Sequence, residues 1–149
     1  MPTMDLTYPE GALTAAAREA LAEELTTTLL RAEGAPNTEF FRNVTWLFVH
    51  ELPAAHVLTA GAPAPAPVFR LEVTTPRGAL SDRRRKQLVA EATTAIREAA
   101  GIAEEEALRV WVLCREIDEG SWGAAGHVIE FEQLKAAAKA ERDAAGVQS

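Results

Sequence analysis

The stretch Gly11-Ala12-Leu13-Thr14 recurs later in the chain as Gly78-Ala79-Leu80-Ser81. Working outward from this pair, matching residues continue in the same order through both halves. They are Leu21 and Leu88, Leu29 and Ile96, Gly34 and Gly101, Trp46 and Trp111, Glu51 and Glu116, and Gly61 and Gly126. Pro2 and Pro67 also correspond, since each precedes an expected strand. So many matches in one order indicate an internal duplication, with residues 2–61 as the first unit and 68–131 as the second.

Each unit predicts a strand, a helix and a second strand. Thr14 and Ser81 are suited to N-cap the two helices, and Gly34 and Gly101 are suited to end them. The strands combine β-branched and aromatic residues, while the helices repeat leucine, isoleucine or alanine on one face. The expected elements are Thr3–Tyr8, Leu13–Ala32 and Asn43–Leu52 in the first unit, and Val68–Thr74, Ser81–Ala100 and Leu108–Cys114 in the second.

These units predict an α/β (α+β) fold in a single domain that spans residues 1–149. In each unit a right-handed crossover would join parallel strands, and the two units together would form a four-stranded sheet with both helices on one face. Residues 62–67 are rich in proline and are expected to form an extended connector. Residues 132–149 are expected to form a C-terminal helix and tail. Because apolar strand residues need cover on the other face of the sheet, we expect an oligomer.

Composition excludes several classes of function. The 149 residues carry a net charge of −7, which disfavours a nucleic-acid-binding surface and means that any anionic ligand needs a local cluster of arginines. No apolar run is long enough for a membrane span and no signal segment is evident, so the expected location is cytoplasmic. Cys114 is the only cysteine and the three histidines are scattered, so no metal site is expected. No glycine-rich loop indicates a nucleotide or another cofactor.

Pro2 is the candidate catalytic residue. A small residue after Met1 normally allows removal of the methionine, and Pro2 would then carry a free secondary amine. An amino-terminal amine has an ordinary pKa of about 7.7–8.0, so modest desolvation makes it a base near neutral pH.

The chain resembles the tautomerase superfamily, whose members are built from β-α-β units and use an amino-terminal proline. The resemblance rests on Pro2, Gly78–Asp82, Arg115-Glu116-Ile117 and Gly120-Ser121-Trp122-Gly123. Short members similar to 4-oxalocrotonate tautomerase are single units. Longer members, such as cis-3-chloroacrylic acid dehalogenase, are two units long and form trimers. The resemblance therefore implies a homotrimer with one active site per chain, because the Pro67 nitrogen lies in a peptide bond.

The resemblance also implies that arginines hold a small carboxylate or dicarbonyl substrate, since the guanidinium binds a carboxylate through two hydrogen bonds. Arg77 aligns with a substrate-binding arginine of the dehalogenase branch, and a solvated loop arginine is the alternative. Arg70 and Arg115 are further candidates. Trp122 aligns with an aromatic residue of the pocket wall and is also suited to a trimer contact. The run 83–86, three arginines and a lysine, is expected to be a solvated helix face.

The expected function is enol–keto tautomerisation with Pro2 as general base. The histidine and tyrosine on which the dehalogenase branch depends are replaced here by Leu29 and Leu113, so hydrolytic dehalogenation is disfavoured. Two alternatives stay open. One is a dehalogenase- or hydratase-like enzyme in which Pro2 acts as an acid. The other is a non-catalytic trimeric scaffold.

Overall fold

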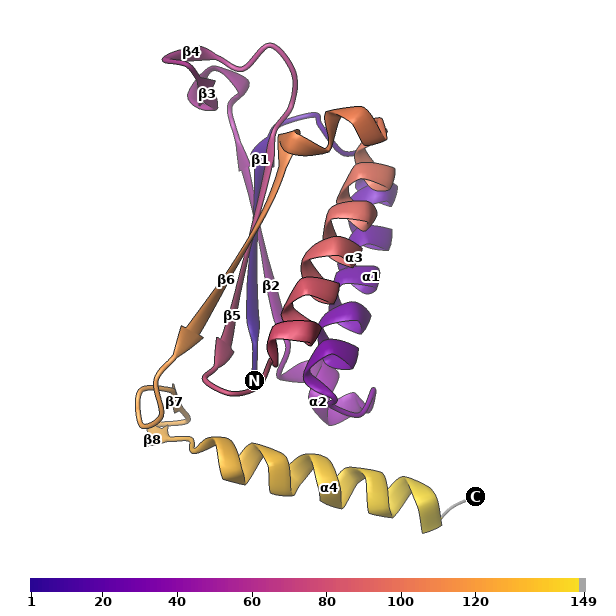
Figure 1. Ribbon diagram of the computed structural model, residues 1–149, viewed down its shortest axis with the longest axis vertical. Helices are drawn as coiled ribbons and strands as arrows, with labels where there is room; N and C mark the ends of the chain where they lie inside the picture. Colours follow the sequence, from indigo (N-terminus) through magenta and orange to yellow (C-terminus); the bar gives the residue numbers. More distant parts are fainter. Residues whose placement is uncertain (148–149) are drawn as a thin grey trace.

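The computed structural model describes residues 1–147 and confirms the expected fold class. Its main sheet has the strand order β2-β1-β5-β6 (Figure 1). Strand β1 (Thr3–Pro9) runs parallel to β2 (Trp46–Leu52), and β5 (Phe69–Pro76) runs parallel to β6 (Val110–Ile117). The two units meet where β1 and β5 pair in antiparallel orientation at the centre of the sheet.

Helices α1 (Ala15–Glu33) and α3 (Asp82–Ala100) cover one face of this sheet (Figure 1). The Thr14 side chain accepts a hydrogen bond from the Ala17 amide, and Ser81 accepts the equivalent bond from Arg84. Both helices then end at a glycine in the left-handed region, Gly34 at φ 69° and Gly101 at φ 65°. The N-cap residues and the terminating glycines therefore predicted the bounds of both helices to within about two residues.

The core lies between the sheet and the two helices. Alternate residues of each strand face the helices, as the two-residue period of a strand requires. The strands supply Met4, Leu6, Tyr8, Phe69, Leu71 and Val73, and the helices supply Leu21, Leu25, Leu29, Leu88, Ala92 and Ile96, all of them buried.

Short elements follow the main strands in both units. A short helix α2 (Glu39–Asn43) precedes β2, and 3-10 turns lie at Ala54–His56 (η1) and Glu104–Arg109 (η2). Strands β3 (Leu58–Thr59) and β4 (Ala62–Pro63) form a hairpin, as do β7 (Gly123–Ala124) and β8 (His127–Val128). The extended connector expected at 62–67 therefore begins instead as the second strand of a hairpin.

Matching hydrogen bonds show how closely the two units repeat each other. The indole nitrogen of Trp46 donates to the Asn43 carbonyl at 3.0 Å, and the indole nitrogen of Trp111 donates to the Leu108 carbonyl at 3.0 Å. Both hairpins turn through an alanine and a glycine with positive φ, at residues 60–61 and 125–126.

Strand register corrects one detail of the sequence alignment. Trp46 lies opposite Thr3, and its repeat equivalent Trp111 lies opposite Arg70. Thr3 and Arg70 are therefore equivalent, which makes Phe69, rather than Pro67, the structural counterpart of Pro2.

The second face of the sheet carries no helix (Figure 1). Trp46, Phe48, Trp111 and Leu113 lie on this face and are 58, 48, 60 and 39% exposed. These residues make the apolar surface that was expected to need cover by an oligomer.

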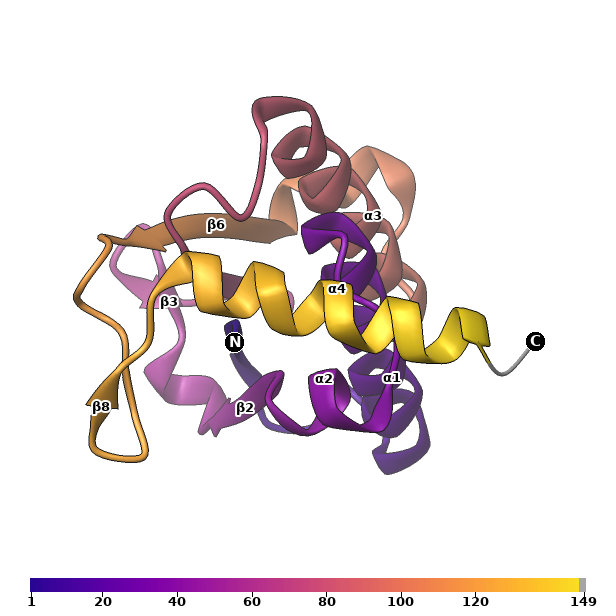
Figure 2. The same ribbon diagram turned by 90° about the horizontal axis from the view of Figure 1, so that it is seen from below.

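Helix α4 (Phe131–Val147) crosses the end of the molecule at which the chain begins (Figure 2). Among residues 1–147, no helix has the length and apolar character that a membrane span requires.

Candidate active site

A cavity of about 490 Å³ lies between α4 and the end of the sheet at which the chain begins. We call it the amino-terminal cavity. Its wall includes Met1, Glu33 at the end of α1, Pro76 at the end of β5, and Ala79 between β5 and α3. Helix α4 supplies its roof. Figure 2 shows α4 passing across the chain start, with α2 beside it.

The amino group lies at this cavity. Met1 is half-buried and lines the wall, while Pro2 is buried and its carbonyl accepts a 3.2 Å hydrogen bond from the Trp46 amide. This bond continues the β1–β2 pairing, so it holds the chain start at the end of a central strand. Burial lowers the pKa of the Met1 amino group from its ordinary value of 8.0, and the Glu33 carboxylate partly opposes this shift.

Glu33 is the only carboxylate among the described residues that line the cavity. It is the last residue of α1, directly before the left-handed Gly34, so the helix stop places it beside the chain start. Burial raises the pKa of Glu33 to about 7, and the nearby ammonium group opposes the rise. The charge of each of these two groups therefore influences the pKa of the other.

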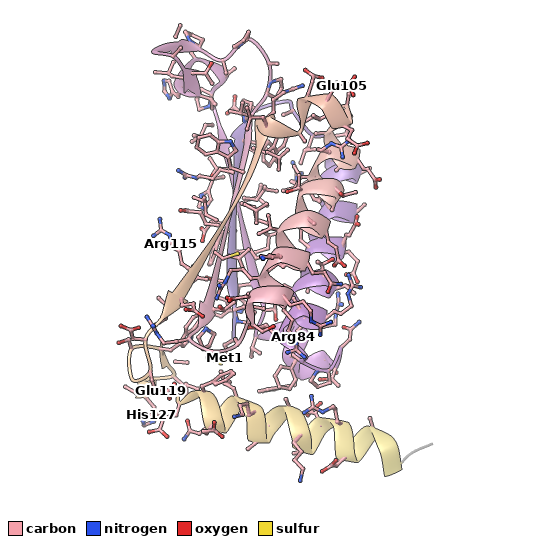
Figure 3. The ribbon with its side chains drawn as sticks, in the orientation of Figure 1. Met1, Arg84, Glu105, Arg115, Glu119 and His127 are labelled. Carbon is pink, nitrogen blue, oxygen red and sulfur yellow. The ribbon has the colours of Figure 1, made fainter. Side chains whose placement is uncertain are left out.

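Four cationic side chains surround the same cavity: Arg84, Lys135, Lys139 and Arg142. Arg84 comes from the first turn of α3, and the other three come from α4. Figure 3 shows Met1 and Arg84 at the same end of the molecule, both above α4. This local cluster of positive charge stands out in a chain whose net charge is −7, and it indicates a local site for an anion.

The arginines of this group hold the turn after α1 in place. Arg142 donates to the Gly34 carbonyl at 2.9 Å, and Arg84 approaches the Glu33 carbonyl at 3.5 Å. Neither guanidinium is paired with a carboxylate in the described part of the chain, which leaves donors for a ligand.

Helix α4 is held by a small apolar cluster separate from the main core. Ala138 is 8% exposed and packs with Leu30 and Phe41. At the start of the helix, the Phe131 amide donates to Glu119 at 2.9 Å. The lysines of α4 are exposed, and each lies near an acidic residue of the same helix.

The arginines that the sequence suggested for substrate binding lie away from the amino-terminal cavity. Arg77 is exposed and pairs with Asp118, with its Nε at 2.7 Å from the carboxylate. Arg115 pairs with Glu72 at 2.7 Å on the open face of the sheet, on the far side from the helices (Figure 3). Arg70 lies on the same face and lines a different cavity. None of the three is among the described residues that line the amino-terminal cavity.

Trp122 is half-buried at the start of the second hairpin, where its carbonyl accepts a 2.8 Å hydrogen bond from Ile129. In the described chain it does not line the amino-terminal cavity. The structure therefore places Met1, the neighbour of Pro2, among a different set of polar side chains.

Sequence reasoning missed Glu33, Arg84 and the cations of α4. Arg84 was assigned to a solvated helix face, because the run of basic residues fits the outward side of α3. One sequence feature distinguishes Arg84 from Arg83. Arg84 is three residues after the N-cap Ser81, in the first turn of α3, and its amide donates to the Ser81 side chain. Since the alignment covered little beyond residue 131, α4 could not be placed over the cavity.

Comparison with known proteins agrees with this geometry. A family model described as Tautomerase enzyme matches residues 71–132, essentially the second unit. The solved structure of Pt0534, inactivated by 2-oxo-3-pentynoate, is 26% identical with a TM-score of 0.72, covering 89% of this chain and 98% of its own. The second unit matches the tautomerase family model, and the chain as a whole is similar in fold to tautomerase superfamily structures.

Other superfamily structures share the fold at lower identity. A fused 4-OT described as a symmetric trimer is 21% identical, with a TM-score of 0.70 and coverage of 89% of this chain and 98% of its own. N1, of the cis-3-chloroacrylic acid dehalogenase family, is 19% identical, with a TM-score of 0.71 and coverage of 89 and 88%. No curated protein matches this chain.

Proposed function

We propose that this protein is a tautomerase that moves a proton between the enol oxygen and a carbon of a small carboxylate or dicarbonyl substrate. The general base is Pro2 after removal of Met1. One observation carries the proposal: the chain starts at a cavity in which burial lowers the pKa of the amino group. Pro2 is buried directly beside Met1, and we propose that burial also lowers the pKa of its nitrogen once Met1 is removed.

The proposed reaction needs only one group that gains and then returns a proton. The neutral Pro2 nitrogen accepts the proton of the enol hydroxyl, and the resulting ammonium donates a proton to carbon as the carbonyl forms. No atom is gained or lost overall. A base works best when its pKa lies near the working pH, and partial desolvation of an amine moves its pKa in that direction.

We further propose that Arg84 binds the anionic group of the substrate, with the cations of α4 adding to the attraction. Arg84 lines the cavity and keeps free donors, whereas Arg77 is already paired with Asp118. A role for Arg77, Arg115 or Trp122 would need them to reach a cavity completed by another chain. The superfamily trimer offers such an arrangement, and we propose that this protein is also a homotrimer.

The test has two steps. Intact mass spectrometry should show a chain that lacks Met1, which frees the Pro2 amine. Pro2→Ala should then lower kcat/KM for ketonisation of phenylenolpyruvate or 2-hydroxymuconate by about 100-fold or more, because a positioned general base contributes about that much. Pro67→Ala is the matched control and should keep wild-type activity.

The same variants separate the alternatives. A Pro2 pKa near 9, read from the pH dependence of kcat/KM, would indicate an acid, as in the hydratase-like alternative. Unchanged ketonisation in Pro2→Ala would leave the non-catalytic scaffold as the better description.

A further inference from the structure

Two arginines of the amino-terminal cavity converge on one turn of the backbone. Arg84, in the first turn of α3, and Arg142, in the second half of α4, both reach residues 33–34, where α1 ends. Arg142 donates to the Gly34 carbonyl at 2.9 Å. The Arg84 guanidinium lies 3.2 Å from the position that a Cβ on Gly34 would take. Two positively charged groups from different helices therefore contact the same residue.

The positive charge at this turn is not neutralised within the described part of the chain. No carboxylate there pairs with either guanidinium, whereas Lys135 and Lys139 of the same cavity pair with Glu132 and Asp143. Each guanidinium keeps further N–H donors beyond its contact with the backbone. Like charges held close together repel each other, so an anion that contacts both guanidiniums removes this repulsion and gains charge-assisted hydrogen bonds.

The two arginines lie away from the face at which we expect copies of the chain to meet. Gly34 ends α1 and Arg84 lies at the start of α3, and these helices cover one face of the sheet (Figure 1). The exposed apolar residues of strands β2 and β6 lie on the opposite face. An interface on that face therefore does not occupy the site between Arg84 and Arg142.

The rest of the cavity wall can hold the carbon body of a small molecule. Pro76, Ala79, Phe131 and Leu134 line it and are apolar. Met1 lines the same cavity, so a ligand held by the two arginines shares the cavity with the chain start. The volume of about 490 Å³ is typical of sites for small molecules.

We propose that the substrate of the amino-terminal cavity carries a phosphate or phosphonate group, and that Arg84 and Arg142 bind this group together. The proposal rests on the proposed function, because the molecule bound here is the one on which Pro2 acts. A phosphate monoester carries about two negative charges near neutral pH and offers several acceptor oxygens. One compact dianion therefore matches two guanidiniums that meet at one residue. The two carboxylates of a dicarboxylate are separated along its carbon chain and would need guanidiniums at separate places.

Phenyl phosphate and phenyl sulfate test the proposal, because they have nearly the same shape but carry about two charges and one charge. Titration calorimetry of the full chain at pH 7.5 and fixed ionic strength should show phenyl phosphate binding at least about tenfold more tightly than phenyl sulfate. Arg84→Met and Arg142→Met keep an aliphatic side chain, and each should weaken phenyl phosphate binding by about tenfold or more. Arg83→Met is the matched control at an exposed position and should bind like the wild type.

Hydrogen exchange gives a second readout. Because a bound phosphate group links α3 to α4, amide exchange of α4 should slow when phenyl phosphate binds to the wild type. It should not slow in Arg84→Met, which keeps the contact between Arg142 and Gly34. Pro2→Ala should bind phenyl phosphate like the wild type, so a failure of the proposed catalysis is distinguished from a failure of this binding site.

Three results would overturn the proposal. The first is no saturable binding of phenyl phosphate at millimolar concentration. The second is equal affinity for phenyl sulfate, since the site would then not select a dianion. The third is wild-type affinity in Arg84→Met or Arg142→Met, or an equal loss in Arg83→Met, since the arginines would then only hold the end of α1 or attract anions in general.

Discussion

At the scale of single residues, the site depends on how charge is arranged around one amine. Glu33 raises the pKa of the amino group while burial lowers it. Glu33→Gln should therefore lower that pKa further, and the acid limb of the kcat/KM profile should move to lower pH. Glu24→Gln, an exposed change on the same helix, should leave the profile in place. A shift toward higher pH would contradict the proposed coupling.

Glu33 should also make stability depend on pH. Its pKa is about 7 in the folded chain and 4.5 ordinarily, so between these values the folded state holds the proton more tightly than the unfolded state. Stability due to this group is full below about pH 4.5 and falls as pH rises toward 7. Urea unfolding at pH 5 and pH 7.5, at fixed protein concentration, should show this fall in the wild type by up to about 3 kcal/mol. In Glu33→Gln the fall should be smaller.

Arg84 lines the amino-terminal cavity, whereas its neighbour Arg83 does not. Arg84→Ala should raise KM for an anionic enol by about tenfold or more with a smaller change in kcat, because it removes a charge-assisted contact to the substrate. Arg83→Ala removes the same charge from an exposed position that does not line the cavity, and it should leave KM unchanged. Equal effects of the two variants would point to general electrostatic attraction instead of a specific contact.

At the scale of elements, local sequence signals predicted the main helices well because their caps are local. Thr14, Gly34, Ser81 and Gly101 end or begin helices through hydrogen bonds and φ values that need no distant partner. Helix α2 was missed because it is too short to be stable without packing, which Phe41 supplies by contact with Leu30 and Ala138. The candidate site could not be assembled for the same reason, since α4 reaches it only through long-range contacts.

Helix α4 is the element most open to test. Ala138→Glu buries a charge against Leu30 and Phe41 and should release the helix, whereas Ala140→Glu places the same charge on an exposed position of α4. Hydrogen exchange of α4 should accelerate in the first variant only, and KM should rise as the cations of the roof are lost. The sheet and α1 should remain protected, because their core cluster does not include α4. Unchanged exchange of α4 in Ala138→Glu would contradict this packing.

At the scale of the whole molecule, duplication accounts for the four-stranded sheet and also for the absence of helices on its second face. Two units joined through antiparallel β1 and β5 supply two helices, and both lie on the same face. The sequence predicted this imbalance correctly, since each unit supplies only one long helix to cover the sheet. In the proposed mechanism one catalytic amine has the same origin, because Phe69, the counterpart of Pro2 in the second unit, lies within the chain.

The open face should therefore be where copies of the chain meet. Leu113→Glu places a charge on β6, two residues from Trp111, on the open face whose opposite edge strand β2 carries Trp46 and Phe48. Burying this charge between subunits would be strongly unfavourable. Sedimentation velocity should show a trimer for the wild type and a monomer for Leu113→Glu. Thr94→Glu, on the exposed side of α3, adds the same charge and should remain trimeric. A Leu113→Glu protein that still sediments as a trimer would mean that another surface joins the subunits and that the apolar face needs a different cover.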